Sequence, residues 1–588
     1  MPLPDHLHAH RKWFANVKRL RFHLLRAPIA LFAVAFFGFC AYNSALLEPE
    51  PLQQAYVLTL MLCVLGMLTF AFGRLSLALL VSGGMFFGLK FLSVIKWRYL
   101  ESPLMPADFI YFARESLLQT LEHYPDLREL CIVMVISVPI LLIAIWWLDY
   151  RLLARLPRRS DAIVRVVGAL AFFGAFWMCL QPTGPFASVY RATLWDTLTG
   201  SAHLTNFFNS IHESTPQLPV MSGDVEAEFN WASTAASVQA EIVAQGVRPD
   251  IIQVLEESTF DPSDFTDCTI PQCRPQMFKP DQHTRAHGPL RTHTFGGGTW
   301  VSEFSVLSGM PQDIFGPPGM YAPFVLAPRL RNSLPMLLRR QGYMTIAVYP
   351  LGGNFVNARN AYRAYGFDKF YDPDDLGLPA WQTSDAQMFA AAKRVYDENK
   401  QSGKPIYIVV LTMAQHGPHD SVPLEELPVP FNQGLLPNLP ADQQLNLSSY
   451  LARLQDSDRG MTQLEQDFLH RPQPTVLVHF GDHQPSFGGL IRRLSRRLPI
   501  ELAPYRDALT YFMIKTNFPG PSLPEYPMLD IAYLPSMVLQ AAGLPTDPYF
   551  SALSSMKVRC HGQYEDCPDK PLLKSYYAWI FNHLGVYE

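Results

Sequence analysis

Charged residues are scarce in this sequence, and positive and negative charges nearly cancel. Lys, Arg, Asp and Glu make up 17% of the 588 residues, and the formal net charge at pH 7 is −4. The sequence also has no internal repeat, no low-complexity tract and no stripe of basic and aromatic residues. A protein whose main partner is nucleic acid needs a basic surface, so a nucleic-acid partner is excluded.

Cysteine is also uncommon, with eight residues in the chain. Four are in apolar runs before residue 182 and are expected to be inert fillers, namely Cys40, Cys63, Cys131 and Cys179. The other four form two close pairs, Cys268 with Cys273 and Cys560 with Cys567. A four-cysteine zinc site is the alternative, but neither pair has its usual two-residue spacer. We therefore predict two local disulfides, which favour an oxidising compartment such as a bacterial periplasm.

Long apolar runs are abundant before residue 182. Five are long enough to cross a bilayer core, which takes roughly 20 residues. They lie near 28–47, 55–73, 76–97, 130–149 and 162–181. The first run is long and no small-residue cleavage site follows it, so a cleaved signal peptide is not expected. A single run could be a buried core helix, but five runs separated by basic loops predict membrane spans.

Basic residues around these runs predict the orientation of the chain, because cytoplasmic loops are rich in Lys and Arg. The N-terminal arm, the turn after the second run and the loop after the fourth are all basic. The residues concerned are Arg11, Lys12, Lys18, Arg19, Arg21, Arg26, Arg74, Arg151, Arg155, Arg158 and Arg159. Five crossings then place everything after residue 182 outside. We expect a multi-pass protein of a bacterial inner membrane with its second domain in the periplasm.

The pattern predicts three regions: a transmembrane domain over 1–182, a connector over 183–245 and an external domain over 246–588. The connector mixes prolines, aromatics and polar residues and is expected to be partly an interfacial helix. In the external domain, short apolar runs alternate with helices that begin near Ser333, Ser384 and Leu447. The runs are DIIQVLEES, MTIAVYPL, PIYIVVLT, TVLVHFGDH and LTYFMIKT. Such runs suit strands buried on both faces, so we predict an α/β domain with helices on both sides of a sheet.

Acidic residues and a histidine stand where two of these strands end. Glu256 and Glu257 end the first run, and Asp482 and His483 end the fourth. Ligands of open α/β sheets bind outside the carboxyl ends of strands, so these side chains are expected to converge on one ion. Glu257 is the predicted ligand, whereas Glu256 is expected to be a solvated strand end. Asp482 and His483 are neighbours and reach one ion only at a turn, which the following Gln-Pro pair favours.

A threonine follows three consecutive glycines, at Thr299 after Gly296–Gly298. Glycines let the backbone approach a ligand closely. Glu303 and the apolar stretch after it predict a helix that starts at the threonine, with its positive end available to an anion. The hydroxyl of Thr299 is therefore a candidate nucleophile for phosphoryl transfer.

Two histidines, His416 and His419, flank a Gly-Pro pair directly after a strand. Loop histidines are usually not functional, but two beside a strand end favour a function, and His416 is the predicted functional residue. Arg359 either binds a phosphate or forms a salt bridge. Three other histidines are spread over a loop without ligand spacing and are set aside, namely His283, His287 and His293.

An ordered set of motifs resembles those of the lipoteichoic acid synthase group within the alkaline phosphatase and sulfatase superfamily. The motifs are DIIQVLEES, GGGTWVSEFSVLSGMP, YGFDKFYD, MAQHGPH and HFGDHQP. The resemblance covers most of the chain: five spans, a connector and an external α/β domain. It implies that four residues bind a metal, with the threonine also the nucleophile: Glu257, Thr299, Asp482 and His483.

The resemblance also implies that His416 and Arg359 contact the substrate phosphate. Two positions depart from the group's pattern. The group often has a histidine where YPLGGN stands here, and a tryptophan where Asn357 stands. These departures concern the pocket for a glycerol headgroup.

The activity implied is the transfer of a phosphoglycerol headgroup from phosphatidylglycerol, through a phosphothreonine, to a periplasmic or cell-surface glycan. The implied cofactor is one divalent ion, Mn2+ or Zn2+, with Mg2+ a less favoured choice. Phosphoethanolamine transfer to lipid A or a glycan is the near alternative. A metal-dependent phosphodiesterase or sulfatase-type hydrolase is another, although Thr299 cannot supply the formylglycine of a sulfatase. A third is an inactive metal-binding scaffold.

Overall fold

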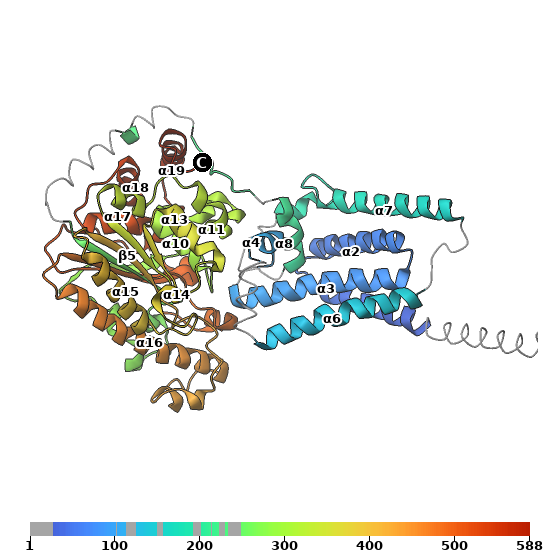
Figure 1. Ribbon diagram of the computed structural model, residues 1–588, viewed down its shortest axis with the longest axis horizontal. Helices are drawn as coiled ribbons and strands as arrows, with labels where there is room; N and C mark the ends of the chain where they lie inside the picture. The colour runs from blue at the N-terminus through green and yellow to red at the C-terminus, as the bar shows by residue number, and fades with distance from the viewer. Residues whose placement is uncertain are drawn as a thin grey trace, which may run out of the picture. The chain divides into compact units, whose positions relative to one another are not determined.

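The computed structural model describes residues 27–100, 103–112, 125–149, 157–191, 202–212, 215–222, 230–232 and 248–588 (Figure 1). The basic N-terminal arm, Arg151, Arg155 and much of the predicted connector lie outside the described residues. The chain divides into two compact units. One comprises Met1–Trp97 and Ser102–Glu213, and the other comprises Arg98–Glu101 and Ser214–Glu588.

Among its described residues, the first unit contains five helices that are long and apolar enough to cross a membrane. They are Ala27–Ser44, α2 (Pro51–Phe72), α3 (Leu75–Leu100), α6 (Pro125–Leu148) and α7 (Arg158–Leu180). Their lipid-compatible surfaces remain exposed in the structure; Val135, for example, is 73% exposed. Exposed apolar surface of this extent requires a lipid environment, so the chain is a multi-pass membrane protein.

A polar contact joins two ends of these helices. Arg74, in the turn between α2 and α3, donates a 2.6 Å hydrogen bond to the carbonyl oxygen of Asp149, which follows α6. The Asp149 carboxylate accepts a 3.0 Å hydrogen bond from the backbone N–H of Leu77. The two ends therefore lie on the same side of the helix bundle, as the predicted orientation requires. The orientation itself stays a prediction.

Two short helices, α4 (Pro106–Tyr111) and α8 (His203–Asn209), are tied to the spans by buried charges. The Glu48 carboxylate accepts hydrogen bonds from the backbone N–H groups of Leu204 and Thr205, at 3.1 and 3.3 Å. Lys96 on α3 forms a 2.8 Å ion pair with Asp108 on α4. The described part of the connector is thus divided, with α8 in the first unit and residues 215–222 and 230–232 in the second.

An eight-stranded sheet runs through the second unit in the order β4-β3-β5-β1-β6-β7-β2-β8. Its strands are β1 (Asp250–Glu256), β2 (Thr284–Arg291), β3 (Met344–Val348), β4 (Lys369–Tyr371), β5 (Ile406–Leu411), β6 (Thr475–Gly481), β7 (Leu509–Thr516) and β8 (Leu529–Asp530). From β4 to β6 the neighbouring strands are parallel. Strand β7 is antiparallel to both β6 and β2, and β8 is parallel to β2. The carboxyl ends of β1, β5 and β6 therefore meet at one edge of the sheet.

Helices cover both faces of this sheet (Figure 1). They are α10 (Thr299–Ser308), α11 (Ala322–Val325), α12 (Leu334–Arg340), α13 (Ala358–Tyr365), α14 (Pro373–Leu376), α15 (Asp385–Lys400), α16 (Ala441–Leu469), α17 (Leu534–Ala541), α18 (Pro548–Arg559) and α19 (Lys570–Tyr577). On one face α15 packs on β5 and α16 on β6, while α12 and α17 pack on the other, joined by α10. The α/β architecture predicted from the sequence is confirmed.

The five predicted strands correspond to β1, β3, β5, β6 and β7, and every residue of β1, β5, β6 and β7 is buried, as their continuous apolar runs require. Helices α12 and α15 begin where predicted, because Ser333 and Ser384 each accept a capping hydrogen bond from a backbone N–H. Helix α16 begins earlier than predicted, at Ala441 after Pro440.

One expectation about this domain is wrong. His283, His287 and His293 are expected in a loop, but Thr284–Arg291 forms β2, so His287 lies in a strand. The segment contains glycine, proline and several polar residues, and only two of its positions are buried. Its pairing with β7 overrides this weak local preference.

The two predicted disulfides, Cys268–Cys273 and Cys560–Cys567, both form in the second unit.

Candidate metal and nucleophile site

Three of the predicted ligands come together beyond the carboxyl ends of β1 and β6. A ligand atom from each of Glu257, Asp482 and His483 lies within 4.8 Å of the other two. His483 Nε2 is 3.3 Å from Asp482 Oδ2 and 3.5 Å from Glu257 Oε1. The three side chains are almost completely buried, at 2% exposure or less. The adjacent Asp482 and His483 both reach the group because the chain turns directly after β6.

The hydrogen bond made by His483 Nδ1 leaves the Nε2 atom of the same ring for a cation. Its Nδ1 is 3.0 Å from the backbone carbonyl oxygen of Gln484, which only accepts, so Nδ1 carries the proton. As a metal ligand the ring must be neutral, and Nε2 then presents a lone pair toward the two carboxylates. Neither Nε2 nor Asp482 Oδ2 has a hydrogen-bond partner among the described residues. Buried acceptors that face one another without a donor fit a bound divalent ion.

Backbone donors fix the Asp482 carboxylate. Its Oδ1 accepts 2.7 Å hydrogen bonds from the backbone N–H groups of Ser258 and His483. Burial, together with the nearby Glu257 carboxylate, raises the pKa of Asp482 well above its ordinary value. Burial alone would also raise the pKa of Glu257, but His483, His416 and the Thr299 hydroxyl lower it. The side chains alone therefore do not favour having both carboxylates ionised, a cost that a cation bound between them would offset.

The candidate nucleophile adjoins this group. Thr299 Oγ1 donates a 2.6 Å hydrogen bond to Glu257 Oε2. Thr299 is the first residue of α10, and the preceding Gly298 has a left-handed φ of 86° that bulkier side chains adopt at a cost. The loop before it is held by a 3.0 Å hydrogen bond from Gly296 N–H to the Gln484 carbonyl oxygen. The helix start thus faces the same place as the candidate ligands.

Two further contacts of α10 support this arrangement. The Ser302 hydroxyl donates a 2.6 Å hydrogen bond to the backbone carbonyl oxygen of Asp482. Glu303, one turn after Thr299, is buried, and this burial raises its pKa to about 8, with the Asp482 and Glu257 carboxylates adding to the shift. In the sequence, Glu303 indicates only the start of a helix. A carboxyl four residues after a candidate nucleophile, on the same helix face, is the signal that could have indicated it.

The expectation that Glu256 is a solvated strand end is wrong. The residue is completely buried, and its Oε2 accepts a 3.2 Å hydrogen bond from the Thr412 hydroxyl. Thr412 also accepts a hydrogen bond from the Glu257 N–H at 3.2 Å. Burial raises the pKa of Glu256 well above its ordinary value, with Asp385 adding to the shift. The residue is enclosed because β1 is the central strand, with a neighbour on each side.

His416 lies close enough to the ligand group for its charge to lower the pKa of Glu257. Its Nδ1 is 2.7 Å from the Gly417 carbonyl oxygen, so Nε2 is free to exchange a proton. Arg453 on α16 fixes the loop by donating a 2.7 Å hydrogen bond to the His416 carbonyl oxygen. His419 is instead buried between Tyr450 and Phe487. Burial lowers the pKa of His419 well below its ordinary value, so this ring stays neutral.

Arg359 forms ion pairs in the structure rather than lying free beside the ligand group. Its Nη2 is 2.5 Å from Asp372 Oδ2 and 3.4 Å from Asp375 Oδ2, and its guanidinium stacks over Phe370 at 5.0 Å. The guanidinium lowers the pKa of Asp372 against the effect of burial. A phosphate role for Arg359 therefore stays a prediction, and it requires exchange of a carboxylate for a phosphate.

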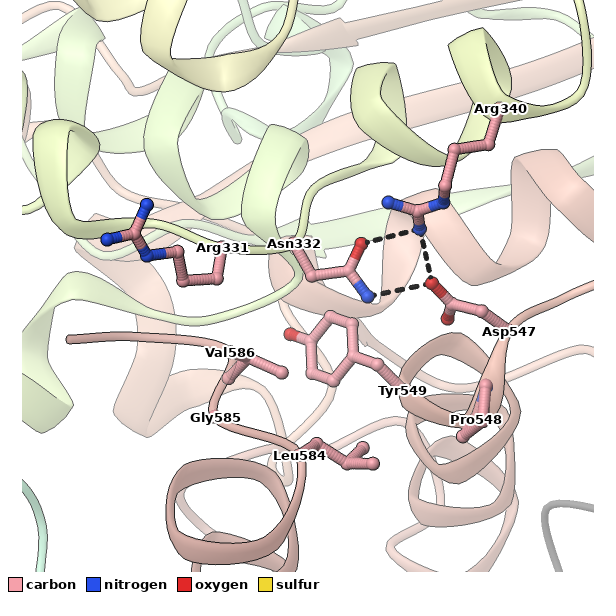
Figure 2. A pocket seen from close by; sticks show the side chains of 9 residues that line it. All are labelled: Arg331, Asn332, Arg340, Asp547, Pro548, Tyr549, Leu584, Gly585 and Val586. Carbon is pink, nitrogen blue, oxygen red and sulfur yellow. Dashed lines mark hydrogen bonds and ion pairs between the residues drawn. The ribbon is translucent and has the colours of Figure 1, made fainter.

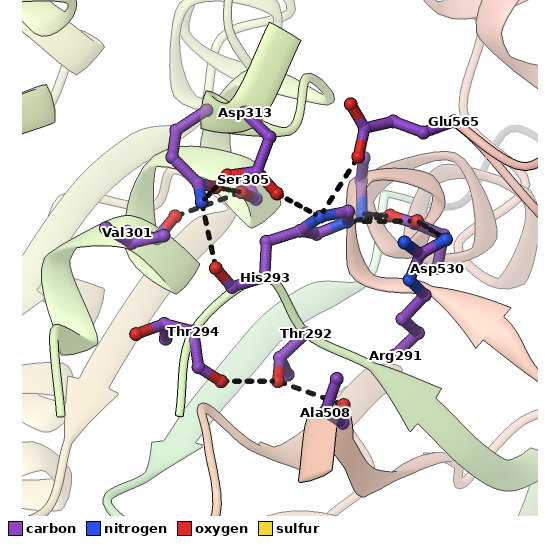
Figure 3. A network of polar contacts seen from close by, with 12 residues as sticks. Arg291, Thr292, His293, Thr294, Val301, Ser305, Asp313, Ala508, Asp530 and Glu565 are labelled. Atoms are coloured by element: carbon purple, nitrogen blue, oxygen red, sulfur yellow. Dashed lines mark hydrogen bonds and ion pairs between the residues drawn. The ribbon is translucent and has the colours of Figure 1, made fainter. Parts of the chain in front are cut away.

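A second group of ionisable residues surrounds His293 (Figure 3). Its Nδ1 is 2.9 Å from Asp313 Oδ2 and 3.6 Å from Glu565 Oε2, and its Nε2 is 3.0 Å from Asp530 Oδ2. Burial alone would lower the pKa of His293, but Asp530 and Asp313 raise it to about 10. Both ring nitrogens face carboxylates, so this residue is a buried imidazolium rather than a metal ligand. His293 does not cluster with His283 or His287.

Two cavities in the second unit lie elsewhere. One of about 140 Å³ is lined by Arg331, Arg340 and Asp547 among others, and Asp547 bonds both Arg340 and Asn332 (Figure 2). The other, of about 380 Å³, lies against β2 and β7 near His287 and Arg497. Neither includes Thr299 or a candidate ligand among its lining residues.

Comparison with known proteins identifies this part of the chain. The Sulfatase family matches residues 249–518, a stretch that contains every predicted site residue. Residues 249–518 form a sulfatase-family domain. The predicted membership in the alkaline phosphatase and sulfatase superfamily is confirmed for this domain, and strands β1 to β7 of the sheet described above lie within it.

Two curated relatives extend beyond the sulfatase domain. An uncharacterized protein of Haemophilus influenzae is 29% identical over 547 residues, which cover 88% of this chain and 94% of the relative. A protein of Rhizobium meliloti, named as a putative cyclic beta-1,2-glucan modification protein, is 26% identical and covers 74% of this chain and 68% of the relative. The similarity therefore includes the membrane helices as well as the sulfatase domain.

A solved structure shares the fold of the second unit. The Streptococcus pyogenes phosphoglycerol transferase GacH, in complex with sn-glycerol-1-phosphate, superposes with a TM-score of 0.50 at 17% identity. The match covers 64% of this chain and 99% of that one. At this identity the likeness concerns the fold.

Proposed function

We propose that this chain is a membrane-bound transferase that moves a phosphoglycerol headgroup from phosphatidylglycerol to a glycan outside the cytoplasm. The intermediate is a phosphodiester on Thr299. The observation that carries the proposal is the 2.6 Å hydrogen bond from Thr299 Oγ1 to Glu257 Oε2, beside the unpartnered Asp482 Oδ2 and His483 Nε2. A buried hydroxyl at a helix start, next to a divalent-cation site, is an arrangement suited to phosphoryl transfer.

Four residues would hold the ion: Glu257, Thr299, Asp482 and His483. Three oxygens and one imidazole nitrogen suit Mn2+ or Zn2+, and Mg2+ less well. A divalent ion bound there lowers the pKa of a hydroxyl and offsets charge on phosphoryl oxygens.

The chain's own residues then divide the reaction into two steps. In the first, the Thr299 hydroxyl gives its proton to Glu257 across their hydrogen bond and Oγ1 bonds to the phosphorus, while the bond from phosphorus to the diacylglycerol oxygen breaks and His416 gives that oxygen a proton. In the second, a sugar hydroxyl bonds to the phosphorus and His416 takes its proton, while the bond to Thr299 Oγ1 breaks and Glu257 returns the proton to that oxygen. The Glu257 hydrogen bond orients the threonine for both steps.

Three further facts support this proposal. The chain anchors its sulfatase domain to a membrane, where a phospholipid donor is concentrated. The Rhizobium relative is named for glucan modification. The fold is shared with a phosphoglycerol transferase whose structure holds a glycerol phosphate. An external site is proposed because the two disulfides suit an oxidising compartment.

Labelled lipids distinguish this proposal from phosphoethanolamine transfer and from hydrolysis. Membranes that contain the full chain are incubated with Mn2+, a glycan and either [2-³H]glycerol-labelled phosphatidylglycerol or ethanolamine-labelled phosphatidylethanolamine. We expect the glycerol label on the glycan and none with Thr299→Ala. Ethanolamine label on the glycan would favour the second transferase, and label only in free glycerol phosphate would favour a phosphodiesterase.

A further inference from the structure

Two loops of the sulfatase domain bring an aromatic group against His416. Trp381, in the loop between α14 and α15, lies 5.3 Å from His416 between ring centroids, with the planes at 76°. The ring of Phe355, in the loop before α13, lies 5.2 Å from Trp381 at 83°. All three rings are only partly buried. A partly exposed aromatic surface therefore adjoins the proposed proton-transfer residue.

The backbone around these rings is strained. Trp381 has a left-handed φ of 67°, and in the facing loop Val356 and Asn357 have φ values of 43° and 60°. Bulky side chains rarely adopt this region, and they do so where the surrounding structure holds them. The neighbours of Trp381 in sequence, Ala380 and Gln382, are exposed, and the ring itself is only partly buried.

Buried hydrogen bonds hold the Trp381 loop to the His416 loop. Asp385 begins α15 four residues after Trp381, and its Oδ1 accepts a 3.2 Å hydrogen bond from the backbone N–H of Ala414. The Ser457 hydroxyl donates to the same carboxylate and accepts from the Gln415 side chain at 3.2 Å. The contact between Trp381 and His416 is thus fixed by a network that reaches three segments of the chain.

We infer that Trp381 and Phe355 form an acceptor subsite that binds a pyranose ring of the glycan beside His416. The inference rests on the proposed function, because His416 there takes the proton of the acceptor hydroxyl. One face of a pyranose consists of C–H bonds and is apolar, and it packs on aromatic rings, whose faces are negative. Its rim of hydroxyls is polar and can reach His416. An aromatic surface does not bind a water molecule in this way. The subsite therefore favours transfer of the headgroup to a sugar over its hydrolysis by water.

This subsite is tested by how the phosphothreonine intermediate divides between transfer to a sugar and hydrolysis by water. The full chain, in nanodiscs with phosphatidylglycerol and Mn2+, is given methyl β-D-glucopyranoside as the probe. The ratio of glucoside product to free glycerol phosphate depends on the second step alone, so differences in donor use cancel. We expect Trp381→Leu to lower this ratio about tenfold, a size typical of one lost stacking contact. Trp381→Phe, which keeps a ring, should recover most of it.

Two controls separate the ring from other effects. Trp381→Gly removes the ring and also relieves the positive φ, so it should match Trp381→Leu if the ring is what matters. Saturation-transfer NMR with the same glucoside reports binding without any chemistry, and its signal should fall in both ring-deleting variants. If wild type binds the glucoside but forms no adduct with the lipid, the proposed function fails while the subsite stands.

Three results would overturn the inference. One is an unchanged product ratio in Trp381→Leu. Another is a fall in adduct formation with the ratio unchanged, which would assign Trp381 to the lipid donor. The third is no difference in glucoside binding between wild type and Trp381→Leu.

Discussion

The hydroxyl of Thr299 and the carboxylate of Glu257 are 42 residues apart in sequence and joined by a 2.6 Å hydrogen bond. The first residue of α10 thereby meets the residue that directly follows β1. Both are required by the proposed chemistry, one as the nucleophile and one as a ligand.

Thr299 is expected to be indispensable. Removing its hydroxyl in Thr299→Ala should lower headgroup transfer by roughly three orders of magnitude or more, as loss of a covalent nucleophile does elsewhere. Thr299→Ser should retain measurable transfer, because it keeps an oxygen at the same place. Transfer rates on purified full-length protein measure the effect, and unchanged melting temperatures show that folding is intact. Wild-type rates in Thr299→Ala would contradict the assignment of Thr299 as the nucleophile.

The neighbours Glu256 and Glu257 form a matched pair. Glu257 contacts Thr299 and lies beside His483, whereas Glu256 is bonded to Thr412 and faces Asp385. Glu257→Gln should abolish transfer, since a neutral amide is a poor ligand for a divalent ion. Glu256→Gln should keep most of it, because burial already favours the uncharged form of this residue. Equal losses in both variants would contradict the assignment of Glu257 as the ligand.

Metal binding should raise the thermal stability of the protein. A ligand that binds only the folded state stabilises it by about 2.7 kcal/mol at 100 times its Kd, so Mn2+ or Zn2+ should raise the melting temperature of wild type. Asp482→Asn should remove this increase. Without metal the same variant should be no less stable than wild type, because burial disfavours the charged Asp482 carboxylate. The exposed Asp456 on α16 provides the control Asp456→Asn, which should respond to metal like wild type.

His293 predicts a pH dependence of stability that is separate from the metal. Its pKa is raised from 6.5 to about 10 in the fold, where it faces Asp313, Asp530 and Glu565, with Arg291 beside Asp530. A histidine whose pKa is raised by folding stabilises the protein fully at pH values below its unfolded-state pKa. This stabilisation is lost as the pH rises through its folded-state pKa. The stability lost in His293→Gln should therefore be greatest near pH 6 and shrink toward pH 10.

Thermal melts of the full chain from pH 6 to pH 10 measure this dependence. His470, which is exposed at the end of α16, gives the control His470→Gln, and it should show no such trend. A stability difference for His293→Gln that grows with pH would contradict the imidazolium assignment.

Much of the sulfatase domain could be predicted from its sequence because central strands are continuous apolar runs. The same reasoning placed Glu257, Asp482 and His483 at strand ends, where the structure brings them together. The prediction was wrong for Glu256, because the sequence of one strand does not show that another strand lies on each side of it. It also failed for β2, whose polar sequence becomes a strand only through pairing with β7.

Contacts between segments that are distant in sequence could not be predicted either. Trp381 and His416 meet through loops whose geometry depends on Asp385 and Ser457, and no periodic pattern encodes such a meeting. His293 has no ligand spacing in the sequence, and its partners Asp530 and Glu565 are more than two hundred residues away from it.

Intact-protein mass spectrometry tests the central claim most directly. The full chain is incubated with phosphatidylglycerol and Mn2+ in the absence of an acceptor, and the adduct is then mapped by fragmentation. The account predicts a mass increase of one glycerol phosphate unit, located on Thr299 and absent in Thr299→Ala. An adduct on another residue, or turnover of the lipid with no adduct under any quench condition, would contradict it.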